Sequence, residues 1–167
     1  MALRSTLHAA GAAALAQLLC GQEQPPERRE IPCPCGHTAR YRELRSRLVL
    51  AEDDRELGDA LDRWELALFQ DDPFRAEQLR HALEAALGDG DGTWAAGMRA
   101  AALLGETAQE RADLVDRFRT PTLDLVRRLL VAVLLHGNRA KLLRELDQSL
   151  LGLRARPAGG VAELRAS

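Results

Sequence analysis

The sequence predicts a mainly α-helical protein: an N-terminal helix and a small cysteine turn, then a six-helix antiparallel bundle or α-α array. Two observations support this fold class. Leucine and alanine recur at three- and four-residue spacing through residues 52–151, as on the buried faces of amphipathic helices. Short stretches of turn-forming residues separate these patterns, and short connections make neighbouring helices antiparallel. Because aromatic residues are only 4% of the chain, the core must consist mainly of Leu and Ala.

Capping residues and glycines predict where the helices begin and end. The first of the six helices has one apolar face, formed by Leu57, Leu61, Trp64 and Leu68. The residues predicted to start or cap the six helices are, in order, Asp53, Asp72 (before Pro73), Thr93, Thr107, Thr120 (before Pro121) and Asn138. Glu56 and Glu110 follow two of these caps by three residues and predict capping boxes. Gly88 and Gly137 are expected to end the second and fifth helices, and residues 152–167 to form a mobile tail.

The N-terminal fifty residues have a different character. Residues 5–20 predict a helix with a stripe of small and apolar side chains, and a polar linker containing two prolines follows. A Cys-Pro-Cys-Gly-His turn begins at Cys33, and residues 39–50 fit a strand or a helix equally well. We therefore expect an N-terminal segment, residues 1–50, and a separate helical domain, residues 52–151.

Charge is distributed unevenly between these two regions. Residues 1–50 contain seven basic and four acidic residues, a net charge of +3. The remainder contains sixteen basic and twenty-one acidic residues, a net charge of −5, and the whole chain carries −2. Such a balance does not call for nucleic acid as the partner of the whole chain, but it leaves a basic N-terminal region.

The turn at Cys33 contains the best candidate metal ligands in the sequence. Cys33, Cys35 and His37 carry side chains that bind zinc, and the glycine between them permits a tight turn. A structural zinc site needs four ligands, and no second Cys-x-x-Cys pair follows. Two interpretations therefore stand: a zinc site completed by another ligand, or a metal-free turn with reduced thiols. Three cysteines make a poor disulfide framework, so we expect a reducing, cytoplasmic location.

Residues 7–50 resemble the N-terminal region of bacterial insertion-sequence transposases of the ISKra group. The resemblance rests on the small-residue helix of residues 7–19 and on Cys33-Pro-Cys-Gly-His-Thr-Ala-Arg-Tyr-Arg42, which match that region in order and composition. It implies a transposase-derived protein that contacts DNA through Arg40, Tyr41, Arg42, Arg45 and Arg47. The second Cys-x-x-Cys and the acidic catalytic domain of that family are not visible after Leu50. We therefore expect a DNA-binding remnant that is not an enzyme.

The charge of the arginine cluster agrees with DNA binding, but a simpler interpretation of these arginines exists. Four cations spaced two or three residues apart can neutralise several phosphates, and Tyr41 can stack on a base. The same arginines would also suit a solvated surface partly paired with Glu43.

A second class of function assigns the helical domain, residues 52–151, to binding a protein partner or a second copy of the chain through its leucine faces. Catalysis has weaker support: Asp89-Gly-Asp-Gly-Thr93 resembles the nucleophile loop of haloacid-dehalogenase-like phosphatases. That loop must follow a buried strand, whereas helix-forming residues precede it here, so we expect a helix–helix turn. The apolar run from Leu129 to Leu135 is too short to cross a bilayer, so we expect no membrane partner.

Replacing Arg40, Arg42, Arg45 and Arg47 together by Ala tests the DNA-binding hypothesis. We expect the affinity for duplex DNA to fall and its dependence on salt to become shallower, because fewer counterions are released on binding. Titration of labelled DNA at several salt concentrations measures both quantities, with the double variant Arg117→Ala and Arg119→Ala as the control. Binding that survives the four substitutions unchanged would contradict the hypothesis.

Overall fold

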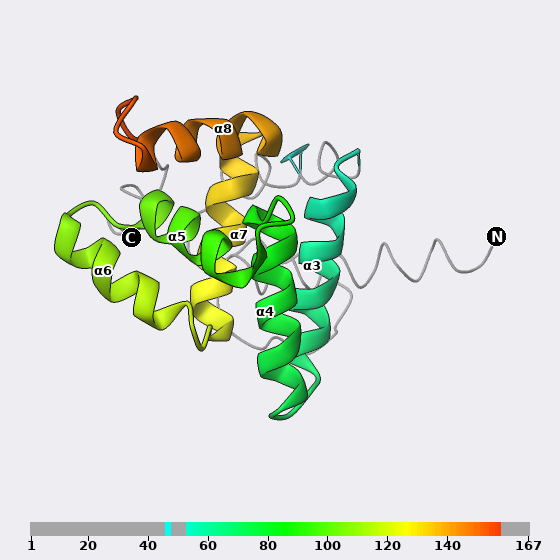
Figure 1. Ribbon diagram of the computed structural model, residues 1–167. Helices are drawn as coiled ribbons and strands as arrows, with labels where there is room; N and C mark the ends of the chain where they lie inside the picture. Colours follow the sequence, from blue (N-terminus) through cyan, green and yellow to red (C-terminus); the bar gives the residue numbers. More distant parts are fainter. Residues whose placement is uncertain (1–45, 48–52, 158–167) are drawn as a thin grey trace, which may run out of the picture. The chain divides into compact units, whose positions relative to one another are not determined.

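The computed structural model describes residues 46–47 and 53–157, which lie almost entirely in the second of two compact units of the chain, Arg47–Ser167 (Figure 1). The described residues contain six α-helices and no strand, which confirms the mainly α-helical prediction for this part of the protein. The helices are α3 (Arg55–Leu68), α4 (Phe74–Leu87), α5 (Gly92–Leu104), α6 (Ala108–Arg117), α7 (Leu123–His136) and α8 (Arg139–Leu150).

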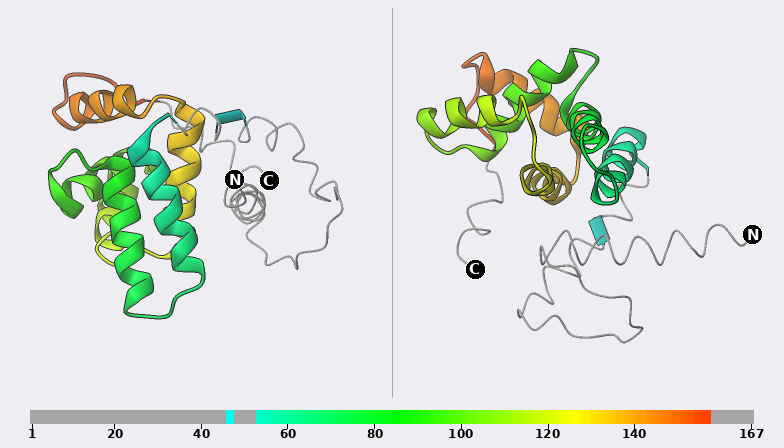
Figure 2. Two further views of the ribbon diagram at one scale, coloured as in Figure 1. Left: turned by 90° about the vertical axis from the view of Figure 1, so that its right-hand side faces the viewer. Right: turned by 90° about the horizontal axis from the view of Figure 1, so that it is seen from below.

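Helix α7 is one of the two most buried helices of the domain, together with α5. Helices α3 and α4 form an antiparallel hairpin beside α7, and α5, α6 and α8 complete the array (Figure 2). Helix α7 packs against α3, α4, α5 and α8, and eight of its fourteen residues are buried. The seven residues from Leu129 to Leu135 are all apolar, and the first six of them are buried.

The core consists of leucine, alanine and valine, as the composition predicts. Helix α5 contributes mainly alanines, which let its neighbours approach closely. A Cβ added at Gly97 would stand 3.4 Å from the Cβ of the buried Phe118, so the mid-helix glycine lies against the residue that ends α6. A glycine in the middle of a helix costs stability, and the close contact offsets this cost because it buries an aromatic ring.

Four predicted helix ends are confirmed, and one of them is Gly88, the residue that ends α4. Thr107 and Glu110 form the predicted capping box at the start of α6. The side chain of Asn138 caps α8 by accepting a hydrogen bond from the backbone N–H of Lys141 at 2.8 Å. Gly137 ends α7 with φ of 78°, a left-handed conformation that glycine adopts at little cost.

Four predicted helix starts are wrong in detail. Asp54, not Asp53, caps α3, since its extended backbone directs its carboxylate to the N–H of Leu57 at 3.0 Å. Helix α7 begins after Thr122, not Thr120, because the Thr122 hydroxyl accepts from Leu125. The remaining two starts, at Asp72 and Thr93, carry no side-chain cap. Pro73 takes the N-cap position of α4, and the Thr93 hydroxyl donates to Glu84 of the preceding helix.

Two buried or half-buried arginines hold the C-terminal end of α4. The side chain of Arg99, in α5, donates to the backbone oxygen of Leu87 at 3.1 Å. Arg139, in α8, donates to the backbone oxygens of Ala85, Ala86 and Gly88 at 3.1, 2.9 and 2.7 Å. The last carbonyls of a helix have no partner within it and carry partial negative charge, so cationic donors suit them. These contacts join α4 to α5 and α8.

Arg99 also forms the main buried ion pair of the domain. Only 6% of the residue is exposed, and its guanidinium binds the Asp147 carboxylate of α8 through two nitrogens, at 2.6 and 3.2 Å. It donates to Asp91, in the loop before α5, at 3.0 Å. The hydrogen bond with Asp147 raises the pKa of Arg99 despite the opposing effect of burial. One side chain therefore joins two helices, a loop and a helix terminus.

Replacing Arg99 by Met should lower the free energy of unfolding by about 2–3 kcal/mol, because a carbonyl and two carboxylates lose a charged donor. The carboxylate of Asp147 is partly exposed to water, which keeps the expected loss below that of a fully buried pair. Urea denaturation followed by circular dichroism measures the change. The exposed Arg80 of α4, replaced by Met, is the matched control. If the free energy of unfolding falls no more for Arg99→Met than for Arg80→Met, the contacts of Arg99 contribute little to stability.

Candidate protein-interaction site

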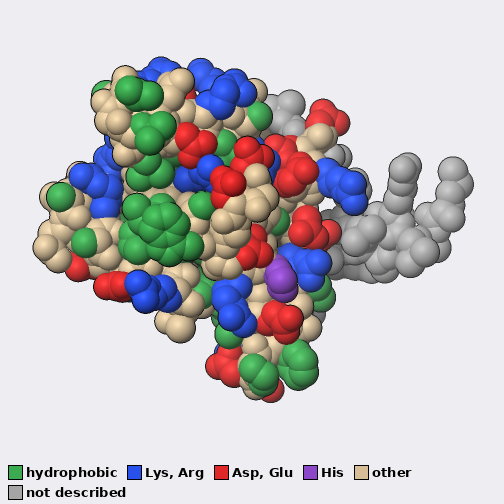
Figure 3. All heavy atoms as spheres, in the orientation of Figure 1, with side chains coloured by type: hydrophobic (Ala, Val, Ile, Leu, Met, Phe, Trp, Pro, Cys, Tyr) green, Lys and Arg blue, Asp and Glu red, His purple; other side chains and the backbone are tan. Residues whose placement is uncertain are grey.

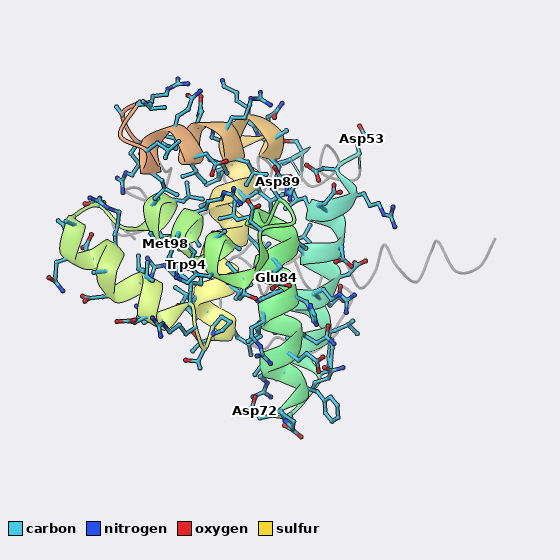
Figure 4. The ribbon with its side chains drawn as sticks, in the orientation of Figure 1. Asp53, Asp72, Glu84, Asp89, Trp94 and Met98 are labelled. Carbon is cyan, nitrogen blue, oxygen red and sulfur yellow. The ribbon has the colours of Figure 1, made fainter. Side chains whose placement is uncertain are left out.

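Among the aromatic side chains of the described helices, the most exposed is that of Trp94, in the first turn of α5. It is 68% exposed, whereas Trp64 in α3 is 2% exposed and donates its indole N–H to the backbone oxygen of Leu123 at 3.2 Å. Met98, one turn further along α5, is half-buried and lies beside Trp94 (Figure 4). Figure 3 shows the resulting hydrophobic patch near the middle of one face of the domain.

The backbone that leads into Trp94 is held in place by its turn and by side-chain contacts. Gly90 and Gly92 adopt positive φ in the turn that enters α5. The hydroxyl of Thr93 donates to Glu84, and Asp91 accepts from Arg99 at 3.0 Å. The indole is therefore presented from an anchored helix start, and binding there would cost little ordering of the backbone.

Acidic side chains lie on the α4 side of this patch. Glu84 and Asp89 both lie toward α4 from Trp94 in the stick view (Figure 4), and the Asp91 side chain is 56% exposed. His81 lies 3.7 Å from Glu84 and from Glu77, on the exposed face of α4. A ligand of this surface would meet an aromatic ring and a thioether, with carboxylates on the side toward α4.

Two further groups of apolar side chains are exposed at the ends of helices. The first lies at the tip of the α3–α4 hairpin and consists of Leu66, Phe69 and Phe74, which are 47%, 81% and 63% exposed. The second follows the end of α8 and consists of Leu150, Leu151 and Leu153. A complete core lies beneath both groups, so their exposure is not a gap in packing.

Charge is crowded beside the hairpin tip. Partial burial raises the pKa of Glu65, and the neighbouring carboxylate of Asp62 raises it further. Glu65 and Asp62 are three residues apart in α3, so like charges lie on adjacent positions of the helix surface. A cation placed here would be stabilised.

A second polar cluster joins α7, α8 and the segment after α8. The carboxylate of Glu145 lies 3.2 Å from the His136 ring and 3.2 Å from the Arg154 guanidinium. Burial alone would raise the pKa of Glu145, but the hydrogen bond with His136 and the charges of Arg154 and Lys141 outweigh it, and the pKa is lowered. Arg156 donates to the backbone oxygen of Gly105. The segment up to Pro157, predicted to be mobile, is thus attached at two points.

Most residues predicted to bind zinc or DNA lie outside the described residues: Cys33, Cys35, His37, Arg40, Tyr41, Arg42 and Arg45. Arg47 is described and is half-buried, with its guanidinium against Gly137. It lines a cavity of about 290 Å³ together with Asp53, Asn138 and Arg139. The structure therefore places one of the five predicted DNA-binding residues, at the α7–α8 turn.

The loop that resembles a phosphatase nucleophile loop follows helix α4, which ends at Leu87. The predicted helix–helix turn is confirmed, and the buried strand that such a nucleophile requires is replaced by a helix. Asp91, the second aspartate of this loop, is paired with Arg99. Over the described part of the chain, no cluster of His, Cys, Asp or Glu has a geometry suited to a metal ion.

Sequence reasoning did not single out Trp94, Phe69 or the leucines after α8. A signal for Trp94 existed: it falls outside the face of α5 formed by Ala96, Ala100 and Leu103, so a helical projection leaves it uncovered.

Comparisons with known protein families, curated proteins and solved structures find no match. None of the described helices has the length and hydrophobicity needed to cross a membrane.

Replacing Glu145 by Gln should lower the unfolding temperature at neutral pH, because His136 and Arg154 lose their anionic partner. The folded-state pKa lies below the ordinary value of 4.5, so the contribution of the carboxylate is present above that pH and is lost as the pH falls through the lower folded-state value. Thermal unfolding of both proteins across the acidic range should therefore show a difference that shrinks below about pH 4.5. Glu106→Gln, at an exposed position, is the control; a difference independent of pH would refute the assignment.

Proposed function

We propose that residues 53–157 form a protein–protein interaction module, with Trp94 and Met98 at the centre of a binding surface. The observation that carries the proposal is the 68% exposure of Trp94 on a helix whose opposite face is fully buried. Trp and Met are enriched in the buried centres of protein interfaces, where a single Trp often contributes much of the binding energy.

The surroundings of the patch indicate the chemistry of the partner. Glu84 and Asp89 lie toward α4 from Trp94, and Asp91 precedes Trp94 by three residues in the chain. A partner that places an apolar side chain on the indole and basic residues against these carboxylates would match both features. We therefore propose a protein segment that combines apolar and basic residues.

The alternative, a transposase-derived DNA-binding role, rests on the N-terminal resemblance and stays a prediction. The two functions separate by location. The interaction module depends on helix α5, whereas DNA binding depends on the arginines between residues 40 and 47. Substitutions in one region should leave the other activity unchanged.

Site-specific photo-crosslinking tests the proposal in the full-length chain. A benzophenone amino acid at position 94 should give a discrete adduct in the native cell, whereas the same group at the exposed position 113 of α6 should not. Once the partner is identified and purified, Trp94→Ala should weaken its binding by at least about tenfold, as for an interface hot spot. Equal labelling at positions 94 and 113, or unchanged affinity of the Ala variant, would overturn the proposal.

A further inference from the structure

The outward faces of α3 and α8 carry matching patterns of opposite charge. Along α3, four exposed residues form one stripe: Asp59, Asp62, Leu66 and Phe69. Along α8, four exposed residues form another: Lys141, Arg144, Gln148 and Leu151. In both stripes the spacing is three, four and three residues, which is the spacing of a coiled-coil seam. Each stripe begins with two charges and ends with an apolar side chain at the residue that caps the helix C-terminus.

From this match we infer that a second copy of this chain binds here, with α3 of one copy packed in parallel and in register against α8 of another. The alignment places Asp59 opposite Lys141 and Asp62 opposite Arg144. It then places Leu66 opposite Gln148, and Phe69 opposite Leu151. Equivalent seam positions face each other in parallel coiled coils, so this single register pairs both charges and one apolar contact.

Charge complementarity favours a second copy over an unrelated partner. On α3, Asp62 and Glu65 are three residues apart, and the pKa of Glu65 is raised by partial burial and further by the charge of Asp62. Incoming cations from α8 would relieve that repulsion. The two acidic residues of α8 lie outside its stripe and are turned inward. Glu145 is 8% exposed, and Asp147 binds Arg99. The outer face of α8 is therefore cationic, although α8 itself contains two acids.

The geometry determines the kind of assembly. Helices α3 and α8 lie on different sides of the domain (Figure 1) and their outer stripes face solvent, so the contact joins two different surfaces. Such a heterologous contact leaves one unused stripe at each end of a dimer, and it continues into a longer chain or closes into a ring. This inference goes beyond the proposed function, because it uses no residue of the Trp94 surface.

Sedimentation of the full-length protein at increasing concentration tests the inference. We expect the average mass to rise past that of a dimer and to fall when salt is added, because screening shortens the reach of the charge pairs from about 10 Å at 0.1 M to about 3 Å at 1 M. Two double variants reverse the charges: Asp59→Lys with Asp62→Lys, and Lys141→Glu with Arg144→Glu. Each alone should weaken association by at least about tenfold.

Mixing the two reversed variants provides the decisive readout. The first presents cations on both stripes and the second presents anions on both, so an equimolar mixture should associate again as alternating copies. Asp113→Lys with Asp116→Lys, on α6, changes the net charge as the first variant does and should leave association intact. Gln148→Leu should strengthen association, since it replaces the polar side chain opposite Leu66. Far-ultraviolet circular dichroism checks that each variant is folded.

The outcomes separate this inference from the proposed function. A wild-type chain that stays monomeric at every concentration overturns self-association, as does association that the reversed variants retain or that their mixture fails to restore. Crosslinking at position 94 is unaffected by any of these results. Conversely, loss of the Trp94 adducts with intact self-association would overturn the Trp94 surface alone.

Discussion

The C-terminal end of α4 is the point on which the rest of the domain depends. Arg99 and Arg139 reach it from α5 and α8 and bind four consecutive backbone oxygens, those of residues 85–88. In a core made of leucine and alanine, dispersion and the hydrophobic effect bring helices together but specify their relative positions weakly. Directional bonds from two planar guanidinium groups fix the positions of α5 and α8 relative to α4.

The same arrangement organises the surface. By binding Asp91, Arg99 also holds the loop that sets the start of α5, and with it the position of Trp94. By binding Asp147, it turns one acidic side chain of α8 toward the interior, while Glu145 turns inward to His136. The outer face of α8 is left with Lys141 and Arg144. The buried polar contacts thus determine which charges and which rings the domain presents to a partner.

The sequence predicted the fold class, the number of helices in the described domain and the helix ends at Gly88, Thr107, Gly137 and Asn138, because leucine spacing, glycines and capping side chains act locally. It misplaced the starts of α3, α4, α5 and α7, where two neighbouring residues could cap equally well or where the hydroxyl of Thr93 found a partner in another helix. The Arg99–Asp147 pair spans 48 residues, and no local pattern indicates it. The exposure of Trp94 could be anticipated only once the buried face of α5 was known, since composition alone assigns a tryptophan to the core.

The two tryptophans give the domain a pair of built-in optical probes with separate meanings. Trp64 joins α3 to the start of α7 through its indole N–H, in a dry setting, and so reports whether the hairpin is docked. Trp94 stands in water at the surface and reports what covers it. Their emission differs in wavelength because one indole is solvated and the other is not. A blue shift of the Trp94 component at constant Trp64 emission would register occupancy of the surface without any label, while a red shift of the Trp64 component would register loss of the fold.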